Sequence, residues 1–118
     1  MRHRTVISDR LAVVRVPFPF TDINASKDRP ALVRADPVGF NTPAGHSVMA
    51  IMTSEANSPW PLDCSITDAG AAGLPAPSKV RFKLLTLDHR LVRGQLGKLA
   101  PTDSHSVHQG LSKLFGPP

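Results

Sequence analysis

The pattern of apolar and polar residues along this chain predicts β-strands over most of its length and one helix at its end. Short apolar runs with a bias toward β-branched residues are separated by segments rich in Pro and Gly, which is typical of strands joined by turns and loops. The predicted strands cover residues 12–16, 30–35, 47–52, a short stretch near 62–66, 78–86, and a last strand over 91–99 that a bulge or bend interrupts. We therefore expect a mainly β protein with helices, of the α+β class.

Two of these strands differ in their expected burial. Residues 47–52 are nearly all apolar, which predicts a central strand covered on both faces, and Thr53 and Ser54 at its end either face a groove or only turn the chain. In 78–86 apolar and basic residues alternate. The apolar face carries Val80, Phe82 and Leu84, and the basic face carries Lys79, Arg81 and Lys83. The basic face fits two interpretations, a stripe that tracks a phosphate backbone or a solvated face protected by lysines.

A long polar loop separates the first two strands, and Pro17, Pro19 and Pro30 mark its ends. Proline lacks a backbone donor, so we expect strand pairing to stop at Pro17 and to resume only after Pro30. Arg29 stands at the second hinge of this loop. A guanidinium held there suits recognition of a phosphate, because its donors are fixed and permanently charged. The alternative is an ordinary solvated arginine.

The remaining connections are rich in turn-forming residues. Residues 36–45 are expected to be an exposed, turn-rich connection, and residues 57–77 to be loop with one helical turn over 69–74. The second connection contains Trp60, the only tryptophan. We expect its ring to cover the core, because apolar burial is the usual role of a large ring; stacking on a base is the alternative.

The C-terminal segment has helical periodicity over 101–115. Residues 101–103 favour a helix start, and Gly116-Pro117 favours a stop. The apolar face of this amphipathic helix carries Val107, Leu111, Leu114 and Phe115. His105 and His108 lie one turn apart, but no third ligand follows at metal-binding spacing, so both are expected to be surface residues.

Length and composition limit the possible functions. The 118 residues suffice for one domain with a small core, so we expect a single domain over 1–118 in which 1–10 is a loose lead-in. No apolar run is long enough to cross a bilayer, and the N-terminus lacks the apolar stretch of a secretory signal, so the expected location is the cytoplasm. Cys64 is the only cysteine, which excludes a disulfide framework and a thiolate metal cluster. No metal or other cofactor is expected.

The charge of the chain narrows the choice of partner. Fourteen Lys and Arg against nine Asp and Glu leave a formal charge of +5. A basic surface attracts polyanions such as nucleic acids through salt-sensitive contacts with phosphates.

Six segments carry a resemblance to a known family. They are Val-Pro-Phe-Pro-Phe-Thr-Asp (16–22), Lys-Asp-Arg-Pro-Ala-Leu-Val (27–33), Met-Thr-Ser (52–54), Gly-Leu-Pro-x-Pro-Ser-Lys-Val-Arg (73–81), Leu-Thr-Leu-Asp (85–88) and Leu-Gly-Lys-Leu (96–99). In this order and spacing, from about residue 12 to 115, the chain resembles the MazF/PemK family of toxin endoribonucleases of type II toxin-antitoxin systems.

The resemblance implies an SH3-like, PemK-type barrel with the C-terminal helix, assembled as a homodimer. It also implies that single-stranded RNA lies in a groove shared across the dimer and is cleaved without a metal. The ribose 2′-OH would attack the adjacent phosphorus and leave a 2′,3′-cyclic phosphate and a 5′-OH. The other implied partner is a cognate antitoxin, whose C-terminal segment would compete for the site beneath a flap over 18–28.

Residue roles follow from the resemblance position by position. Arg29 matches the family's catalytic arginine and would stabilise charge on the phosphorane oxygens, while Thr53 matches its catalytic threonine and would position the phosphate. The residues expected to contact RNA are Phe18, Thr21, Asp22, Lys27, Asp28, Ser54, Lys79 and Arg81. Asp22, Asp28 and Glu55 all remain candidates for the base that removes the 2′-OH proton.

The chain departs from the family at the start of its first strand, where Leu11-Ala12 stands in place of the usual Gly-Asp. Two other functions also stay open. One is a gyrase-binding toxin of the CcdB type, whose helix ends in Trp-Gly-Ile where this chain has Phe115-Gly116-Pro117. The other is a catalytically silent protein that binds RNA or an antitoxin.

Overall fold

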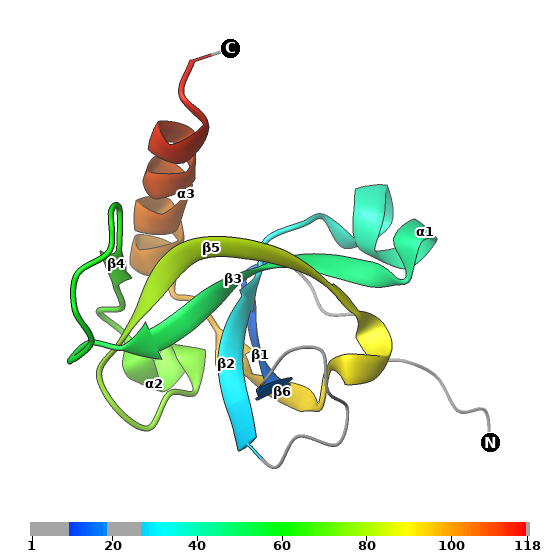
Figure 1. Ribbon diagram of the computed structural model, residues 1–118, viewed down its shortest axis with the longest axis horizontal. Helices are drawn as coiled ribbons and strands as arrows, with labels where there is room; N and C mark the ends of the chain where they lie inside the picture. The colour runs from blue at the N-terminus through cyan, green and yellow to red at the C-terminus, as the bar shows by residue number, and fades with distance from the viewer. Residues whose placement is uncertain (1–9, 19–26, 118) are drawn as a thin grey trace.

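The computed structural model of the protein describes residues 10–18 and 27–117. Within those residues, six antiparallel strands form one curved sheet in the order β4-β5-β3-β2-β1-β6 (Figure 1). The elements are, in chain order, β1 (Ala12–Phe18), β2 (Lys27–Val33), the π-helical turn η1 (Pro37–Asn41), α1 (Thr42–Ala44), β3 (His46–Ser54), β4 (Cys64–Ser65), α2 (Ala69–Ala72), β5 (Ser78–Asp88), the 3-10 turn η2 (His89–Leu91), β6 (Gly94–Lys98) and α3 (Pro101–Phe115). None of the helices in this part of the chain is long and apolar enough to span a membrane.

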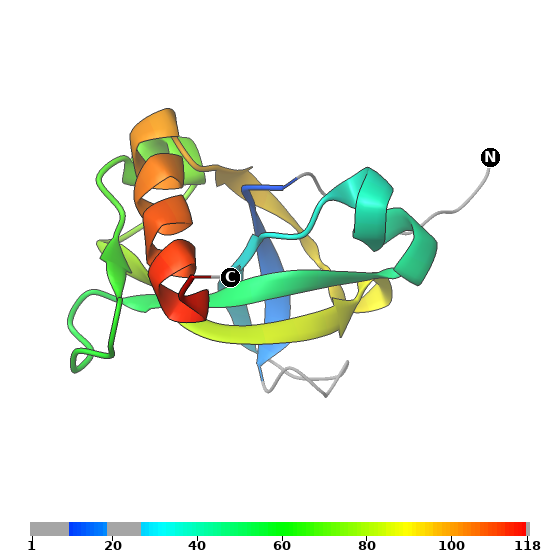
Figure 2. The ribbon, with the colours of Figure 1, turned by 90° about the horizontal axis from the view of Figure 1, so that it is seen from above.

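Buried apolar side chains gather in two clusters, one on each face of the sheet. Successive residues of a strand point to opposite faces, so Val13 of β1 joins one cluster while Val14 and Val16 join the other. Val107 and Leu111 of α3 belong to the cluster of Val13, which places the helix against that face of the sheet. α3 and α2 lie toward one end of the sheet and α1 toward the other (Figures 1 and 2).

Most of the predicted elements are present. The mainly β architecture with a C-terminal helix is confirmed, and α3 begins at Pro101 and ends at Phe115 as its periodicity predicted. The short strand predicted near 62–66 is β4, and the helical turn predicted over 69–74 is α2. The interruption of the last strand is also confirmed, since the pairing of β6 with β1 skips Leu96. β3 is central, with β2 on one side and β5 on the other.

The expectation that strand pairing stops at the prolines was wrong. β1 and β2 pair from Val13 opposite Leu32 to Phe18 opposite Lys27, with Pro17 opposite Asp28 and Arg15 opposite Pro30. β6 pairs with only the first half of β1, and β3 with only the second half of β2, so each proline stands where its strand has a neighbour on one side alone. A strand tolerates a missing N–H at such a position. Arg29 therefore lies within β2 and not at a loop hinge.

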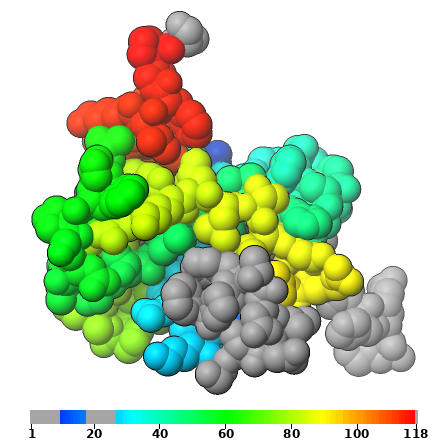
Figure 3. All heavy atoms as spheres, viewed as in Figure 1, coloured from blue at the N-terminus to red at the C-terminus, as the bar shows by residue number. Residues whose placement is uncertain are grey.

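Three apolar residues that were expected to face the core are exposed: Leu84, Leu114 and Phe115. The register of β5 against β3 shifts between Arg81 and Leu84, and beyond that shift the buried residue of β5 is Leu87, which packs on the opposite face of the sheet from Val80 and Phe82. The last turn of α3 stands clear of the surrounding surface (Figure 3), which leaves Phe115 71% exposed. The apolar face of α3 is thus buried only in its first three quarters.

Asp103 joins the first turn of α3 to the loop that precedes α2. Its buried carboxylate accepts hydrogen bonds at Oδ1 from the N–H and the hydroxyl of Thr67, both at 2.8 Å, and at Oδ2 from the N–H of Asp68 at 3.0 Å. Burial alone would raise the pKa of Asp103, but these hydrogen bonds outweigh burial and hold the pKa below its usual value. A residue expected only to favour a helix start thus holds two distant segments together.

His89 gives the fold a pH dependence. It is buried after β5, and its Nε2 lies 2.8 Å from Ser47 Oγ on β3. Burial lowers the pKa of His89, and a backbone hydrogen bond with His46 and the charge of Asp88 oppose that shift only in part. The folded protein therefore favours the neutral ring and loses stability as pH falls below 6.5, the ordinary value, toward the lowered pKa of the folded state.

We expect the free energy of unfolding, measured by urea titration, to fall between about pH 7.5 and about pH 5.5. His89→Gln removes the titrating group, so the variant should lose less stability over the same range. An equal loss in the two proteins would show that other groups cause the pH dependence.

Candidate functional site

Arg29 and Thr53 come together on one face of the sheet. Ala31 of β2 lies opposite Ile51 of β3. Residues two apart on a strand share a face, so Arg29, Ile51 and Thr53 point to the same side. Arg29 and Thr53 both line two adjacent hollows, of ≈ 230 Å³ and ≈ 170 Å³. The two residues that the resemblance marked as catalytic are therefore neighbours at one surface site.

β5 supplies further cations to this site. Thr53 lies opposite Lys79, and Arg81 follows two residues later on the same face. Lys83, further along β5, lines the larger hollow together with Arg29 and Arg81. Among the described residues, no carboxylate lines either hollow. The site is therefore electropositive and suits an anionic group.

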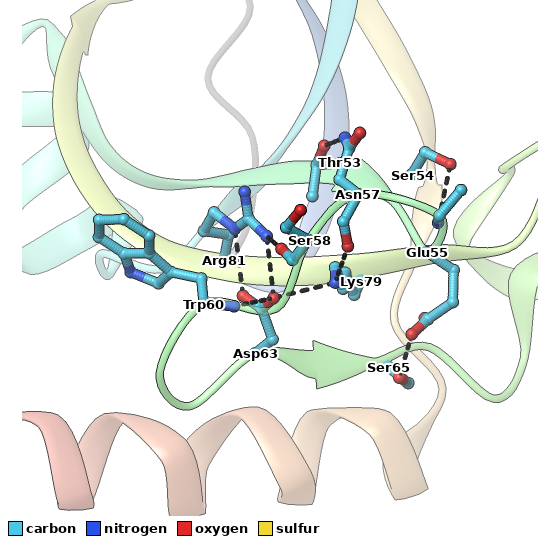
Figure 4. A network of polar contacts seen from close by, with 11 residues as sticks. Thr53, Ser54, Glu55, Asn57, Ser58, Trp60, Asp63, Ser65, Lys79 and Arg81 are labelled. Atoms are coloured by element: carbon cyan, nitrogen blue, oxygen red, sulfur yellow. Dashed lines mark hydrogen bonds and ion pairs between the residues drawn. The ribbon is translucent and has the colours of Figure 1, made fainter.

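Asp63 lies beside two of these cations, Lys79 and Arg81, and offsets part of their charge (Figure 4). Its Oδ2 lies 3.1 Å from Lys79 Nζ and 3.0 Å from Arg81 Nη2, and its Oδ1 accepts a hydrogen bond from Arg81 Nε at 3.2 Å. The Lys79 side chain is 5% exposed and that of Asp63 12%, so water and salt screen these ion pairs only weakly. Burial alone would raise the pKa of Asp63, but the hydrogen bonds from Arg81 and Lys79 hold it below its usual value.

The same cluster holds the loop between β3 and β4. Lys79 Nζ donates to the backbone carbonyl of Asn57 at 2.8 Å, and Arg81 Nη2 donates to the carbonyl of Ser58 at 2.6 Å. Both side chains are themselves fixed by Asp63, so two successive backbone groups of an exposed loop are tied to buried ion pairs.

Asn57 also contacts Thr53 directly. Its side-chain Nδ2 donates a hydrogen bond to Thr53 Oγ1 (Figure 4). Asn57 lines the larger hollow beside Arg29 and Thr53, so the amide and the hydroxyl meet at the edge of the cation-lined space.

Neither of the described candidates for a general base faces this pair. Glu55 accepts a hydrogen bond from Ser65 Oγ at 3.0 Å and points away from Thr53 (Figure 4). Asp28 immediately precedes the site's arginine on β2, so its side chain points to the opposite face, where it lies 2.6 Å from Arg93 Nη1. The third candidate, Asp22, lies outside the described residues.

Trp60 does not cover the core, contrary to the expectation from sequence. It is 44% exposed and belongs to neither buried cluster. Its backbone N–H donates to Asp63 Oδ2 at 3.0 Å, and Lys83 Nζ and Arg81 Cζ lie 4.4 Å and 5.8 Å from the centroid of its ring. An aromatic ring that is half exposed and backed by cations can stack on a flat ligand.

The other residues expected to contact RNA lie outside the described residues or at the exposed ends of strands. Thr21, Asp22 and the side chain of Phe18 lie outside the described residues, as does most of the expected flap. Lys27 begins β2 and is exposed. Ser54 is exposed at the end of β3 and lines the smaller hollow.

Two residues of this site, Asn57 and Asp63, were not predicted from the sequence. The alternation in β5 predicted three basic residues on one face, and such a face needs a counter-charge where it is buried. Asp63, directly before β4, is an acidic residue that could have been predicted to provide it. The solvated-face interpretation was accordingly wrong for Lys79, which is buried, while Lys83 is exposed. No pattern in the sequence marked Asn57, because its role depends on the path of one loop.

Other residues with metal-binding or nucleophilic chemistry lie apart from this site. His105 and His108 are exposed on α3, as predicted. Cys64 lies half-buried in β4, where burial raises the pKa of its thiol. In the two described stretches, no group of three or more His, Cys, Asp or Glu side chains is placed to hold a metal ion.

Comparison with known families gives a match over most of the chain. Residues 9–115 match the profile of a family described as the PemK-like, MazF-like toxin of type II toxin-antitoxin system. A search of curated proteins found no significant match.

Solved structures share the fold. The MazE-MazF structure from Deinococcus radiodurans covers 96% of this chain and 99% of its own, with 23% identity and a TM-score of 0.73. An endoribonuclease in complex with its cognate antitoxin, from a mycobacterial species, covers 95% of this chain and 96% of its own, with 17% identity and a TM-score of 0.72. The Mycobacterium tuberculosis toxin MazF-mt6 covers 88% and 95%, with 17% identity and a TM-score of 0.68. These likenesses confirm the expected PemK-type fold.

Proposed function

Because the chain belongs to the PemK-like, MazF-like toxins of type II toxin-antitoxin systems, we propose that it is an endoribonuclease that cleaves single-stranded RNA. The observation that carries the proposal is the meeting of Arg29 and Thr53 at a hollow that three cations line. Similar folds include a protein described as an endoribonuclease in complex with its cognate antitoxin, which supports the same activity here.

The proposed reaction is an internal transesterification at one phosphodiester. The ribose 2′-oxygen forms a bond to phosphorus as its proton leaves to a base, and the bond from phosphorus to the 5′-oxygen breaks as that oxygen gains a proton. The products are a 2′,3′-cyclic phosphate and a 5′-OH. Arg29 stabilises the negative charge that grows on the phosphoryl oxygens, and Thr53 donates a hydrogen bond that orients the phosphate.

The cations, together with the ring of Trp60, suit an unpaired RNA strand as the substrate. Arg29, Arg81 and Lys83 face the phosphate backbone, while the half-exposed ring of Trp60 beside them can stack on a base only if that base is unstacked from its neighbours. Only RNA supplies the 2′-OH that acts as nucleophile.

We extend the proposal to partners and location. The active form is a homodimer that binds RNA across its interface, and a cognate antitoxin blocks the site. Mycobacterial and Deinococcus structures of the same fold contain an antitoxin, which supports this assignment. Its place of action is the cytoplasm, where the RNA substrate lies.

The direct test is to incubate the purified chain with a long single-stranded RNA in EDTA and to map new 5′-OH ends. We expect cleavage at a short recurring sequence. If the folded, antitoxin-free protein leaves RNA intact, the proposed activity is wrong. Trapping of gyrase on DNA would then favour the CcdB-type alternative, and salt-sensitive RNA binding without cleavage the silent one.

Replacement of Trp60 should weaken RNA binding. Base stacking on an aromatic side chain contributes about 1–3 kcal/mol, so Trp60→Ala is expected to raise the Kd for a short RNA by about fivefold to about 150-fold. Trp60→Phe should restore most of the affinity, because it keeps a stacking face. Fluorescence anisotropy with a labelled RNA measures both. An unchanged Kd for Trp60→Ala would remove Trp60 from the binding surface.

A further inference from the structure

We infer that Asn57 is a positioning residue for Thr53, and that Asp63 holds Asn57 in place through Lys79 and Arg81. The inference rests on the proposed function for its catalytic meaning, but its structural part stands on contacts alone. Asn57 Nδ2 donates to Thr53 Oγ1, and the backbone of Asn57 is bound in turn by Lys79 (Figure 4).

The direction of the hydrogen bond between Asn57 and Thr53 affects which acceptor can receive the proton of the Thr53 hydroxyl. A hydroxyl has one proton to donate and two lone pairs that accept. The amide N–H of Asn57 occupies one lone pair of Thr53 Oγ1, so the hydroxyl proton cannot point at Asn57. It is then available to a phosphate oxygen bound in the hollow that Thr53 lines beside Arg29. Without this contact, a threonine at a strand end tends to donate to a nearby backbone carbonyl.

Asn57 needs an external support because it lies in an exposed loop. Lys79 Nζ supplies that support by contacting two partners at once, the Asn57 carbonyl at 2.8 Å and Asp63 Oδ2 at 3.1 Å. Arg81 repeats the arrangement one residue further on, joining the Ser58 carbonyl at 2.6 Å to the same carboxylate at 3.0 Å.

The carboxylate therefore acts at a distance on the reactive hydroxyl. The chain of contacts runs from Asp63 through Lys79 to the backbone of Asn57, and from the side chain of Asn57 to Thr53. Without the Asp63 charge, Lys79 would be a buried cation without its counter-ion, and the loop would lose its anchor. Asp63 lines neither hollow, so it has no direct role toward the substrate.

Kinetics test the effect on catalysis. Asn57→Ala is expected to lower kcat for RNA cleavage about tenfold with little change in KM, since orientation of one hydroxyl affects the reacting phosphate more than binding of the strand. Asn57→Asp should lose more, because a carboxylate would accept the Thr53 proton and repel the phosphate. Gln109→Ala, which removes an exposed amide from α3, is the matched control and should cut like the wild type. Wild-type kcat in Asn57→Ala would overturn the inference.

A second readout does not depend on activity. The side-chain amide of Asn57 gives an NMR signal that should shift in Thr53→Val, which removes its acceptor, and in Asp63→Asn, which loosens its support; the Gln109 amide should not shift. If Asp63→Asn does not fold, Lys79→Met breaks the same link. Unmoved Asn57 signals would overturn the positioning role even if RNA is cut. Absence of cleavage by the wild type, with shifted signals, would instead overturn only the proposed function.

Discussion

Replacement of Arg29 by alanine is expected to reduce RNA cleavage by about 10³-fold while the protein stays folded. Removal of a charged group that stabilises a transition state at phosphorus typically lowers the rate by this factor. Water that fills the vacated space does not supply the fixed positive charge. Arg29 is exposed on β2 and outside both apolar clusters, so its loss should not disturb the core. Initial rates on a labelled RNA, with circular dichroism of both proteins, provide the measurement.

Two variants separate the role of Arg29 from a general effect of charge. Arg90→Ala removes an equally permanent cation from η2, where the guanidinium pairs with Asp88 at 2.7 Å, and should cut RNA like the wild type. Arg29→Lys should recover only a small part of the rate, because an ammonium lacks the two-pronged geometry of guanidinium. If Arg29→Ala retains more than about a tenth of the wild-type rate, Arg29 does not stabilise the transition state.

The largest effect on stability is expected at Asp103. Asp103→Ala should lower the free energy of unfolding by about 3 kcal/mol, because it removes the buried acceptor of three part-buried hydrogen bonds and leaves their donors without that partner. Urea titration at neutral pH measures the difference. RNA cleavage by the fraction that stays folded should change little, because Asp103 does not line either hollow.

Asp36→Ala is the matched control for this stability effect. Asp36 is exposed, and its Oδ2 accepts one hydrogen bond from the N–H of Gly39 at 2.7 Å, so its loss should cost only about 1 kcal/mol, as for an ordinary helix cap. The loss of stability in Asp103→Asn should lie between those of Asp103→Ala and Asp36→Ala, since the amide keeps one acceptor oxygen. A loss at Asp103 no larger than at Asp36 would mean that water satisfies the freed donors.

Elements whose signal is local were predicted well. The bounds of α3 followed from a helix start at 101–103, a helical apolar period and Gly116-Pro117 at the end, all of which act within a few residues. The short strand β4 and the helical turn α2 were likewise recognised from neighbouring residues. Such signals need no knowledge of the rest of the chain.

Predictions that depended on how a strand pairs with its neighbours in the sheet were less accurate. Pro17 and Pro30 were expected to end strand pairing, which would hold in the middle of a sheet but does not hold where a strand has one neighbour. The alternation in β5 predicted a buried Leu84, but Leu84 lies beyond a register shift against β3 and is exposed. Both errors concern features of the pairing between strands, which the sequence of one strand does not contain.

The residues of the candidate site likewise include some that were predicted from the sequence and some that were not. Arg29 and Thr53 were found through the resemblance of short motifs, and the register of β2 and β3 then brought them to one face. Asp63 and Asn57 were not found, because a carboxylate and an amide in a loop have no periodic pattern and gain a role only from what lies opposite them.

By itself, the sequence determined the mainly β architecture, the C-terminal helix, the basic character of the molecule and its resemblance to a toxin family, because local propensity, periodicity, charge and motif order are properties of the chain. Only the tertiary structure decided that Lys79 is buried against Asp63, that Asn57 meets Thr53, and that Asp28 faces away from the site. The reason is physical: hydrogen bonds and ion pairs depend on distances of a few ångströms between residues far apart in sequence, and strand register and loop path set those distances.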